Sequence, residues 1–150
     1  MLFRSGIDWS TDFPDDLPPL TGKRNEFGQI ALNLILNAAQ AVEGVESPAV
    51  QARARTVPPA DGQDGPGLLL IEVIDNGCGI PETIRDSIFD IFFTTRETRG
   101  GSGIGLAITR HLVASMGGRI AVESVVGSGT TFRLTFPLTG ETVEAPSADR

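Results

Sequence analysis

The chain has 150 residues, the usual length of one domain, and its 40% hydrophobic and 21% charged residues are typical of a globular protein rather than a disordered one. Its net charge of −7 excludes the basic surface of a general nucleic-acid binder, and no apolar run reaches the ~18 residues of a membrane span. A single cysteine, Cys78, and a single histidine, His111, argue against a disulfide framework and against a zinc or haem site. We therefore expect a cytoplasmic, acidic domain without a signal peptide.

The first half of the chain is predicted to contain mainly strands around one long helix. A strand-like N-terminus leads into a loop rich in Pro and Asp over residues 12–21. Residues 23–42 lack proline and have one glycine near the start, which predicts a helix of about five turns. Residues 50–57 alternate as a strand does. Residues 68–74 form a continuous apolar run with one Glu, typical of a strand buried on both faces.

The second half is predicted to add a helix and a hairpin. Over residues 102–116, Ile104, Ile108, Leu112 and Met116 recur four apart, which indicates an amphipathic helix ending at a Gly-Gly pair. Residues 119–126 and 130–137 flank Gly-Ser-Gly and predict a β-hairpin. We therefore predict an α+β fold over residues 1–138, a two-layer sandwich with helices on one face of a mixed, largely antiparallel sheet, followed by a flexible tail at 139–150.

A stripe of amides crosses the otherwise apolar first helix, formed by Gln29, Asn33, Asn37 and Gln40. The simplest explanation for any one of them is a solvated face. Two Asn one turn apart are nevertheless unexpected there, because Asn is a poor helix former and a solvent face favours Glu and Lys. An amide oxygen suits Mg²⁺, which takes few protein ligands and keeps its waters and substrate phosphates.

Two glycine-containing segments are candidates for close approach to a ligand. Residues 75–80, Asp-Asn-Gly-Cys-Gly-Ile, follow the buried strand, and the carboxylate of Asp75 can accept a hydrogen bond from an exocyclic amine. A strand-ending turn explains the same residues. Residues 100–106, Gly-Gly-Ser-Gly-Ile-Gly-Leu, open the second helix and can cradle a phosphate, although a flexible loop is equally compatible. Arg96 and Arg99 precede them and can meet phosphate oxygens or be solvated. The aromatic residues at 89–93 favour a core position.

In this order and spacing, the segments resemble the ATP-binding catalytic domain of bacterial sensor histidine kinases, within the superfamily of DNA gyrase, the heat-shock chaperone ATPases and MutL. Residues 29–41 resemble the N box, 75–79 the G1 box, 89–93 the F box, 101–106 the G2 box and 127–130 the final Gly-x-Gly-Thr. The resemblance covers roughly residues 14–137 and implies the Bergerat-type ATP-binding fold. Gln40 and the Phe-Phe-Thr-Thr segment are most similar to the nitrogen-regulation branch.

The resemblance implies roles for the matching residues. Asn37 would hold Mg²⁺, and Asn33 would line the phosphates, so these two are the expected catalytic residues. Asp75 would recognise adenine, with Gly77 and Gly79 letting the base approach. Thr130 would hold the adenine end through water, and residues 94–100 would form a lid. The expected nucleotide contacts also include Ile80, Phe93, Thr94, Arg96, Arg99, Gly101, Ser102, Gly103, Ile104, Gly105 and Leu106.

Asn33 distinguishes between activities in this superfamily. The ATPases and serine kinases place a general-base Glu at this position, whereas a neutral amide cannot take a proton. A histidine acceptor is itself nucleophilic at neutral pH. We therefore expect a protein-histidine kinase domain that uses ATP and Mg²⁺ to phosphorylate a histidine on a separate dimerisation domain, which then supplies a response regulator receiver domain. A nucleotide-gated interaction module and a superfamily ATPase are the alternatives.

Several expectations concern the isolated chain. It contains no counterpart of the dimerisation domain, so we expect a monomer that does not autophosphorylate. His111 lies within the second predicted helix, away from any phosphoacceptor context, and is expected to be a surface or packing residue. Cys78 is expected to be a small packed residue between two glycines.

Overall fold

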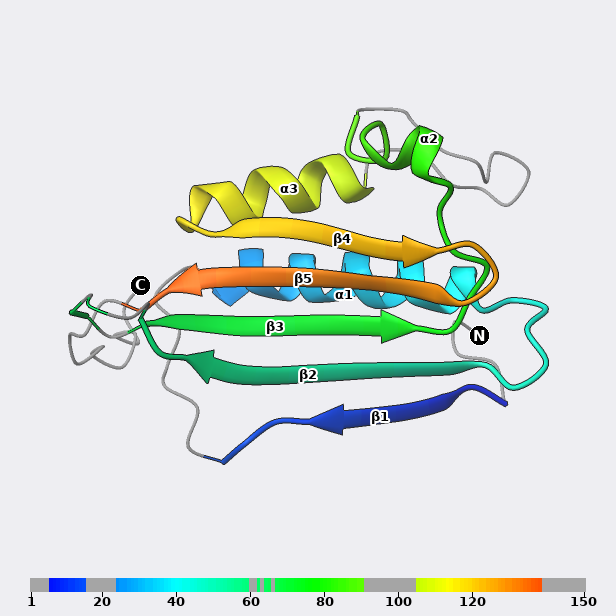
Figure 1. Ribbon diagram of the computed structural model, residues 1–150, viewed down its shortest axis with the longest axis horizontal. Coiled ribbons are helices and arrows are strands. Elements are labelled where there is room, and N and C mark those ends of the chain that lie inside the picture. The colour runs from blue at the N-terminus through cyan, green and yellow to red at the C-terminus, as the bar shows by residue number, and fades with distance from the viewer. Residues whose placement is uncertain are drawn as a thin grey trace.

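The computed structural model describes residues 6–15, 24–59, 62, 64–65, 67–90 and 105–138. In chain order (Figure 1), the elements are β1 (Asp8–Asp12), α1 (Arg24–Ala41), β2 (Ala49–Val57), β3 (Leu68–Asp75), α2 (Glu82–Arg85), α3 (Gly105–Ser115), β4 (Arg119–Val125) and β5 (Gly129–Pro137). The predicted long helix, the two predicted strands β2 and β3, and the β4–β5 hairpin are confirmed within one or two residues. The short helix α2 is not predicted, because its four residues are too few to show a periodicity. The expected tail at 139–150 lies outside the described residues.

The strands form one five-stranded sheet in the order β1-β2-β3-β5-β4. β1 and β2 are parallel, and every other neighbouring pair is antiparallel. The parallel pair arises because α1 carries the chain from the end of β1 back to the start of β2. The predicted α+β sandwich, with a mixed and largely antiparallel sheet, is therefore confirmed.

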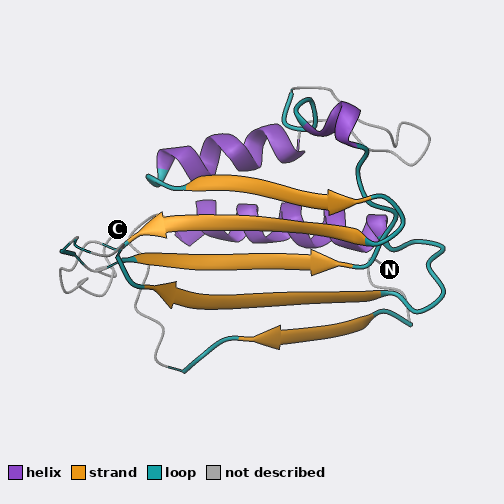
Figure 2. Cartoon of the chain, viewed as in Figure 1, coloured by secondary structure: helices purple, strands orange, loops and turns teal. Residues whose placement is uncertain are grey.

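Both long helices cover the same face of the sheet (Figure 2). α1 packs on β3 and β5, α3 packs on β4, and the two helices contact each other. The core between the layers contains α1 residues spaced four apart, a pattern that places them on one helix face. Its largest fully buried apolar members are Ile30, Leu34, Val42, Val113, Phe132, Leu134 and Phe136. None of the helices in the described part of the chain is long and apolar enough to cross a membrane.

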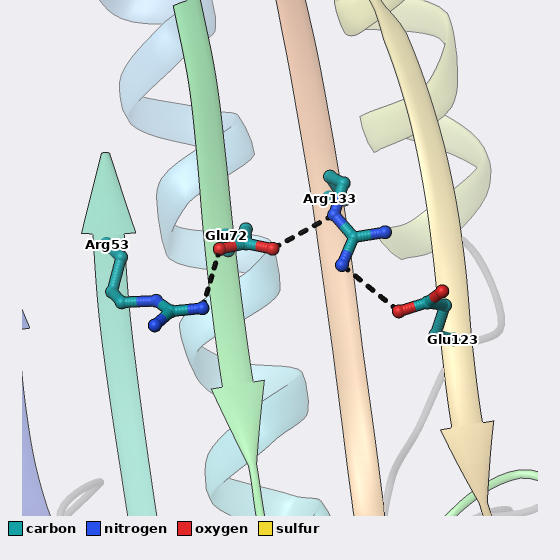
Figure 3. A network of polar contacts seen from close by, with 4 residues as sticks. All are labelled: Arg53, Glu72, Glu123 and Arg133. Atoms are coloured by element: carbon teal, nitrogen blue, oxygen red, sulfur yellow. Dashed lines mark hydrogen bonds and ion pairs between the residues drawn. The ribbon is translucent and has the colours of Figure 1, made fainter. Parts of the chain in front are cut away.

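The opposite face of the sheet carries a line of charged side chains (Figure 3). Glu72 on β3 accepts hydrogen bonds from Arg53 on β2 and Arg133 on β5, each at 2.9 Å, and Arg133 also reaches Glu123 on β4 at 3.0 Å. Although burial raises the pKa of Glu72, the hydrogen bonds and positive charges of the two arginines outweigh it and hold that pKa below its ordinary value. Leu70 and Glu72 on this face are buried, as are Leu69 and Val73 on the other, so β3 is buried on both faces, as predicted.

Three expectations about single side chains have different outcomes. Cys78 is exposed, so the prediction of a packed cysteine is wrong. The close contacts in this loop are made by the flanking glycines, Gly77 against Ala41 and Gly79 against the backbone of Val125 and Val126, and not by the cysteine side chain. His111 is exposed on α3, which confirms the surface position. Phe89 packs edge-on against Phe132 in the core, as expected for this aromatic segment.

The buried face of α3 differs from the predicted apolar stripe. Ile108 is 39% exposed, whereas Thr109 and Val113 are fully buried. A buried hydroxyl requires hydrogen-bond partners, and Thr109 has two, as described below. A polar residue thus occupies the centre of the helix interface, where an apolar periodicity alone does not place it.

Candidate functional site

Three polar residues lie side by side on three neighbouring strands, at one end of the sheet. Asp75 on β3 is the register partner of Thr130 on β5, which is the register partner of Ser124 on β4. All three lie on the helix-covered face, because alternate residues of a strand share a face and Val73 and Phe132, two positions away, belong to the core. Asp75 and Thr130 are only 4% and 5% exposed. We call Asp75, Thr130 and Ser124 the polar row.

The loop after β3 is held in place from several sides. The amide of Gly77 donates to Oδ1 of Asp75 at 2.8 Å, a contact that fixes the carboxylate at the start of the loop. The side chain of Asn76 bonds the backbone of Ser47 and Ala49, which ties the loop to the start of β2. The amide of Cys78 donates to the carbonyl of Ala41, the last residue of α1. The carboxylate of Asp75 is therefore held by a rigid scaffold.

Gly77 and Gly79 are required by backbone packing. A Cβ on Gly77 would lie 2.3 Å from the carbonyl oxygen of Ala41. Gly79 has φ +80°, and its Cβ would lie 2.4 Å from the carbonyl oxygen of Val125, the last residue of β4. These contacts require glycine at both positions whether or not a ligand is bound. The role predicted for both glycines beside adenine stays a prediction.

Asn33 connects the two long helices. Its Nδ2 donates to the carbonyl oxygen of Gly105 at 3.2 Å and to Oγ1 of Thr109 at 3.1 Å, and its Oδ1 accepts from Gln29. The Thr109 hydroxyl in turn donates to the carbonyl of Gly105 at 2.8 Å. Asn33 therefore attaches α1 to the first turn of α3 at Gly105, which belongs to the predicted phosphate-binding segment at residues 100–106.

Asn37 lies one turn further along α1 and is half-buried. Among the hydrogen bonds of the described residues, none involves the side-chain amide of Asn37, whereas that of Asn33 makes three. An amide oxygen left available on a packed helix is a chemically suitable ligand for Mg²⁺. The two Asn of the stripe thus have different surroundings, since the amide of Asn33 is engaged at both ends.

Gly105 begins α3 with open space around it, because a Cβ built on it meets nothing within 4 Å. Glycine in a helix costs about 1 kcal/mol relative to Ala, and packing among the described residues does not require it here. A residue without a side chain at a helix N-terminus leaves room for an anion near the backbone N–H groups. Next to it, Leu106 packs against the core.

The comparison with known proteins decides the family. Residues 22–140 match the family described as histidine kinase-, DNA gyrase B- and HSP90-like ATPase. The chain belongs to this family. The predicted resemblance is confirmed, and the chain is an ATP-binding catalytic domain of the sensor histidine kinase type.

The relatives of this histidine kinase-type domain are longer proteins. The sensor kinase CckA of Brucella abortus (strain 2308) is 36% identical over 143 residues, which cover 91% of this chain and 15% of the relative. The sensory histidine kinase/phosphatase NtrB of Rhodobacter capsulatus is 38% identical over 136 residues, covering 85% of this chain and 36% of that protein. Full-length ShkA, solved in complex with AMPPNP, superimposes with a TM-score of 0.74 at 31% identity, over 94% of this chain and 27% of that one.

The structure brings several of the predicted site residues of this kinase-type domain to one end of the sheet. Asp75 ends β3 beside Thr130 on β5, and the loop after β3 contains Gly77, Gly79 and Ile80. Asn33 meets Gly105 at the start of α3. The remaining predicted contacts lie outside the described residues: Phe93, Thr94, Arg96, Arg99, Gly101, Ser102, Gly103 and Ile104.

Sequence reasoning missed Ser124, Thr109 and Arg85. Ser124 completes the polar row, but only the strand register identifies it, because a serine before a hairpin turn is unremarkable in sequence. Thr109 lies within an apolar helix pattern, and a threonine among apolar residues is the one sequence signal for it. Its burial is seen only in the structure. Arg85 belongs to the short helix that the sequence does not predict.

Proposed function

We propose that this chain binds Mg-ATP along α1 and transfers the γ-phosphoryl group to a histidine on a separate dimerisation domain. The observation that carries the proposal is the polar row, in which a buried carboxylate and a buried hydroxyl sit at the ends of neighbouring strands. Asp75 and Thr130 are the residues we assign to adenine recognition. The complex of the structural relative ShkA with AMPPNP supports a nucleotide as the ligand of this fold.

The positions of the helices support a nucleotide that runs parallel to α1. The end of α1 touches the loop after β3 through Ala41, and Asn33 touches the start of α3. These two α1 residues are eight positions apart, which is about 12 Å at 1.5 Å per residue. Asn37 lies midway between them. We therefore assign the adenine end to the polar row, Mg²⁺ to Asn37 and the phosphates to the start of α3.

The residues fit the chemistry of phosphoryl transfer by positioning and charge neutralisation. ATP supplies the phosphoryl group when bound, and Asn37 would contribute a neutral oxygen ligand to the metal. Neither Asn33 nor Asn37 can act as a general base. An acceptor that brings its own nucleophilicity, as a neutral imidazole does, is therefore the chemically suitable partner. The names of the CckA and NtrB relatives, a sensor kinase and a sensory histidine kinase/phosphatase, favour the same acceptor.

The chain spans 15% of the CckA relative and 36% of the NtrB relative. Both relatives are therefore much longer than this domain. We propose a histidine-bearing dimerisation domain as the direct acceptor and a response regulator receiver domain as the next one. Neither is present in the described residues. The isolated domain should then bind nucleotide as a monomer without labelling itself.

The test is incubation of the chain with γ-labelled Mg-ATP and a separately expressed histidine-bearing dimerisation domain, with the acceptor histidine replaced by Ala in a control. Acid-labile label on the acceptor domain, lost in the Ala control, is the expected result. Nucleotide binding without label would instead support a nucleotide-gated interaction module. Steady release of phosphate by the chain alone would support a superfamily ATPase.

A further inference from the structure

Ser124 is the meeting point of three segments at the proposed adenine end. Its Oγ accepts a hydrogen bond from the backbone amide of Ile80 at 2.7 Å and donates to the carbonyl oxygen of Gly129 at 2.9 Å. The same oxygen lies 2.8 Å from Oγ1 of Thr130. One hydroxyl on β4 thus contacts the loop after β3 and the first two residues of β5.

The number of protons and lone pairs sets the direction of these bonds. A serine hydroxyl has one proton and two lone pairs. The carbonyl of Gly129 can only accept and the amide of Ile80 can only donate, so the proton of Ser124 goes to Gly129 and one lone pair receives Ile80. The second lone pair remains for Thr130, whose hydroxyl must donate when all three contacts form. The proton of Thr130 is then committed, and its oxygen is left as an acceptor.

This direction has a consequence for ligand choice. With its proton committed to Ser124, Thr130 offers only an acceptor to a ligand or an intervening water. Asp75 offers a carboxylate, which is also only an acceptor. Two acceptors favour a base that presents an exocyclic amine, because the amine can donate to them. A base carbonyl in the same place would face another acceptor, and a buried polar group would be left without a hydrogen bond.

Arg85 holds the same two segments through their backbones. Its Nη2 donates to the carbonyl of Ser124 at 2.8 Å and lies 3.4 Å from the carbonyl of Ile80. The amide of Gly127 also donates to the carbonyl of Cys78 at 2.9 Å. The end of β4 and the loop after β3 are therefore joined without the Ser124 hydroxyl, and a variant that lacks this hydroxyl should still fold.

We propose that Ser124 is a positioning residue of the adenine site, which orients the Thr130 hydroxyl as an acceptor and thereby favours adenine over 6-oxo purine nucleotides. This inference rests on the proposed function, because it assumes that the polar row receives the base. It adds the residue that sets the hydrogen-bond polarity of the site.

The experiment compares the affinities of Mg-ADP and Mg-inosine diphosphate, which carries a carbonyl in place of the exocyclic amine. Both are titrated into the wild-type chain, Ser124→Ala, Ser124→Thr and Ser128→Ala. We expect Ser124→Ala to weaken ADP binding about 3- to 10-fold, as for one lost hydrogen bond. Inosine diphosphate binding should weaken less or improve, since the Thr130 proton is released. Ser124→Thr keeps the hydroxyl and should retain the wild-type ratio, as should Ser128→Ala in the exposed β4–β5 turn.

The ratio of the two affinities separates specificity from structure. A purely structural role of Ser124 would weaken both nucleotides equally, and an unchanged ratio in Ser124→Ala would overturn this inference alone. Failure of the wild-type chain to bind ADP would overturn the proposed function, and this inference with it.

Discussion

Asn33 on α1 donates a hydrogen bond of 3.1 Å to the hydroxyl of Thr109 on α3, a residue with no exposed surface. The same amide reaches the carbonyl of Gly105, the first residue of α3. The helix that carries the proposed Mg²⁺ ligand is thereby attached to α3 at Gly105, within the predicted phosphate-binding segment at residues 100–106. Asn33 is consequently a link between the two halves of the proposed nucleotide site.

The first prediction concerns the strength of this link. Asn33→Ala should lower the free energy of unfolding by about 1–2 kcal/mol, because it removes two hydrogen bonds and leaves a buried hydroxyl with fewer partners. Thr109→Val should cost about 1 kcal/mol, since it removes one buried hydroxyl at constant shape. Denaturant unfolding of both variants and of the double variant should give a coupling of at least ~0.5 kcal/mol. Purely additive effects would show that the two side chains do not interact in solution.

The second prediction concerns nucleotide affinity in the same variant. Because its amide is engaged between the helices, Asn33→Ala should leave Mg-ADP affinity largely intact, within about threefold. Asn37→Ala should weaken it in a Mg²⁺-dependent manner, with the difference vanishing when EDTA replaces the metal. Calorimetry with and without Mg²⁺ measures both. Complete loss of binding in Asn33→Ala alone would mean that this residue contacts the nucleotide directly.

The third prediction follows from the depressed pKa of Glu72. A carboxylate with a lowered folded-state pKa contributes stability above its unfolded pKa, near 4.3, and that contribution is lost as the pH falls through the folded-state value. At pH 7, Glu72→Gln should cost about 1–3 kcal/mol, because two bonds to arginine lose their charge. Below pH 4.3 the difference from wild type should shrink steadily.

Urea denaturation between pH 7 and pH 2.5 measures this difference. Glu123→Gln is the matched control, since this residue also contacts Arg133 but its side chain is 69% exposed, and it should change stability little at any pH. A constant gap between wild type and Glu72→Gln across the whole range would contradict the assignment of the lowered pKa to the arginine contacts.

The fourth prediction separates two effects of glycine. Gly79 and Gly127 both have positive φ, at +80° and +84°. An alanine at either position would therefore destabilise the folded state by a similar backbone strain of about 1–2 kcal/mol. Only at Gly79 would the new Cβ also lie 2.4 Å from a carbonyl oxygen, whereas nothing lies within 4 Å at Gly127. Gly79→Ala should therefore lower the melting temperature clearly more than Gly127→Ala. Equal losses would show that the loop after β3 can move away from the hairpin turn.

Much of the fold is accessible from sequence because local rules decide it. The length of α1 follows from a stretch without proline, and the β4–β5 hairpin follows from alternation around Gly-Ser-Gly. The strand order is not accessible in this way. The pairing of β1 with β2 in parallel depends on the path of α1 over the sheet, which no local pattern encodes.

Some residues of the candidate site are likewise recognisable from sequence, and others only from the structure. Asp75 and Thr130 stand out because their motifs have a recognisable composition, and the register then brings them together. Ser124 and Arg85 act through contacts between residues 39 and 44 positions apart in sequence, which only the packed structure reveals. Thr109 escaped notice because a polar residue at a helix interface is acceptable only where a partner such as Asn33 exists, and that partner lies on another element.

The most direct test of the central proposal is calorimetric titration of Mg-ADP into the wild-type chain, Asp75→Asn and Asp12→Asn. Asp12 is an exposed carboxylate on β1, remote from the polar row in strand order, and serves as the matched control. We predict saturable binding by the wild type and by Asp12→Asn, and a loss of at least tenfold in Asp75→Asn, or about 1.4 kcal/mol. Equal affinities of the wild type and Asp75→Asn, or no binding by any of the three proteins, would contradict the assignment of the polar row to adenine.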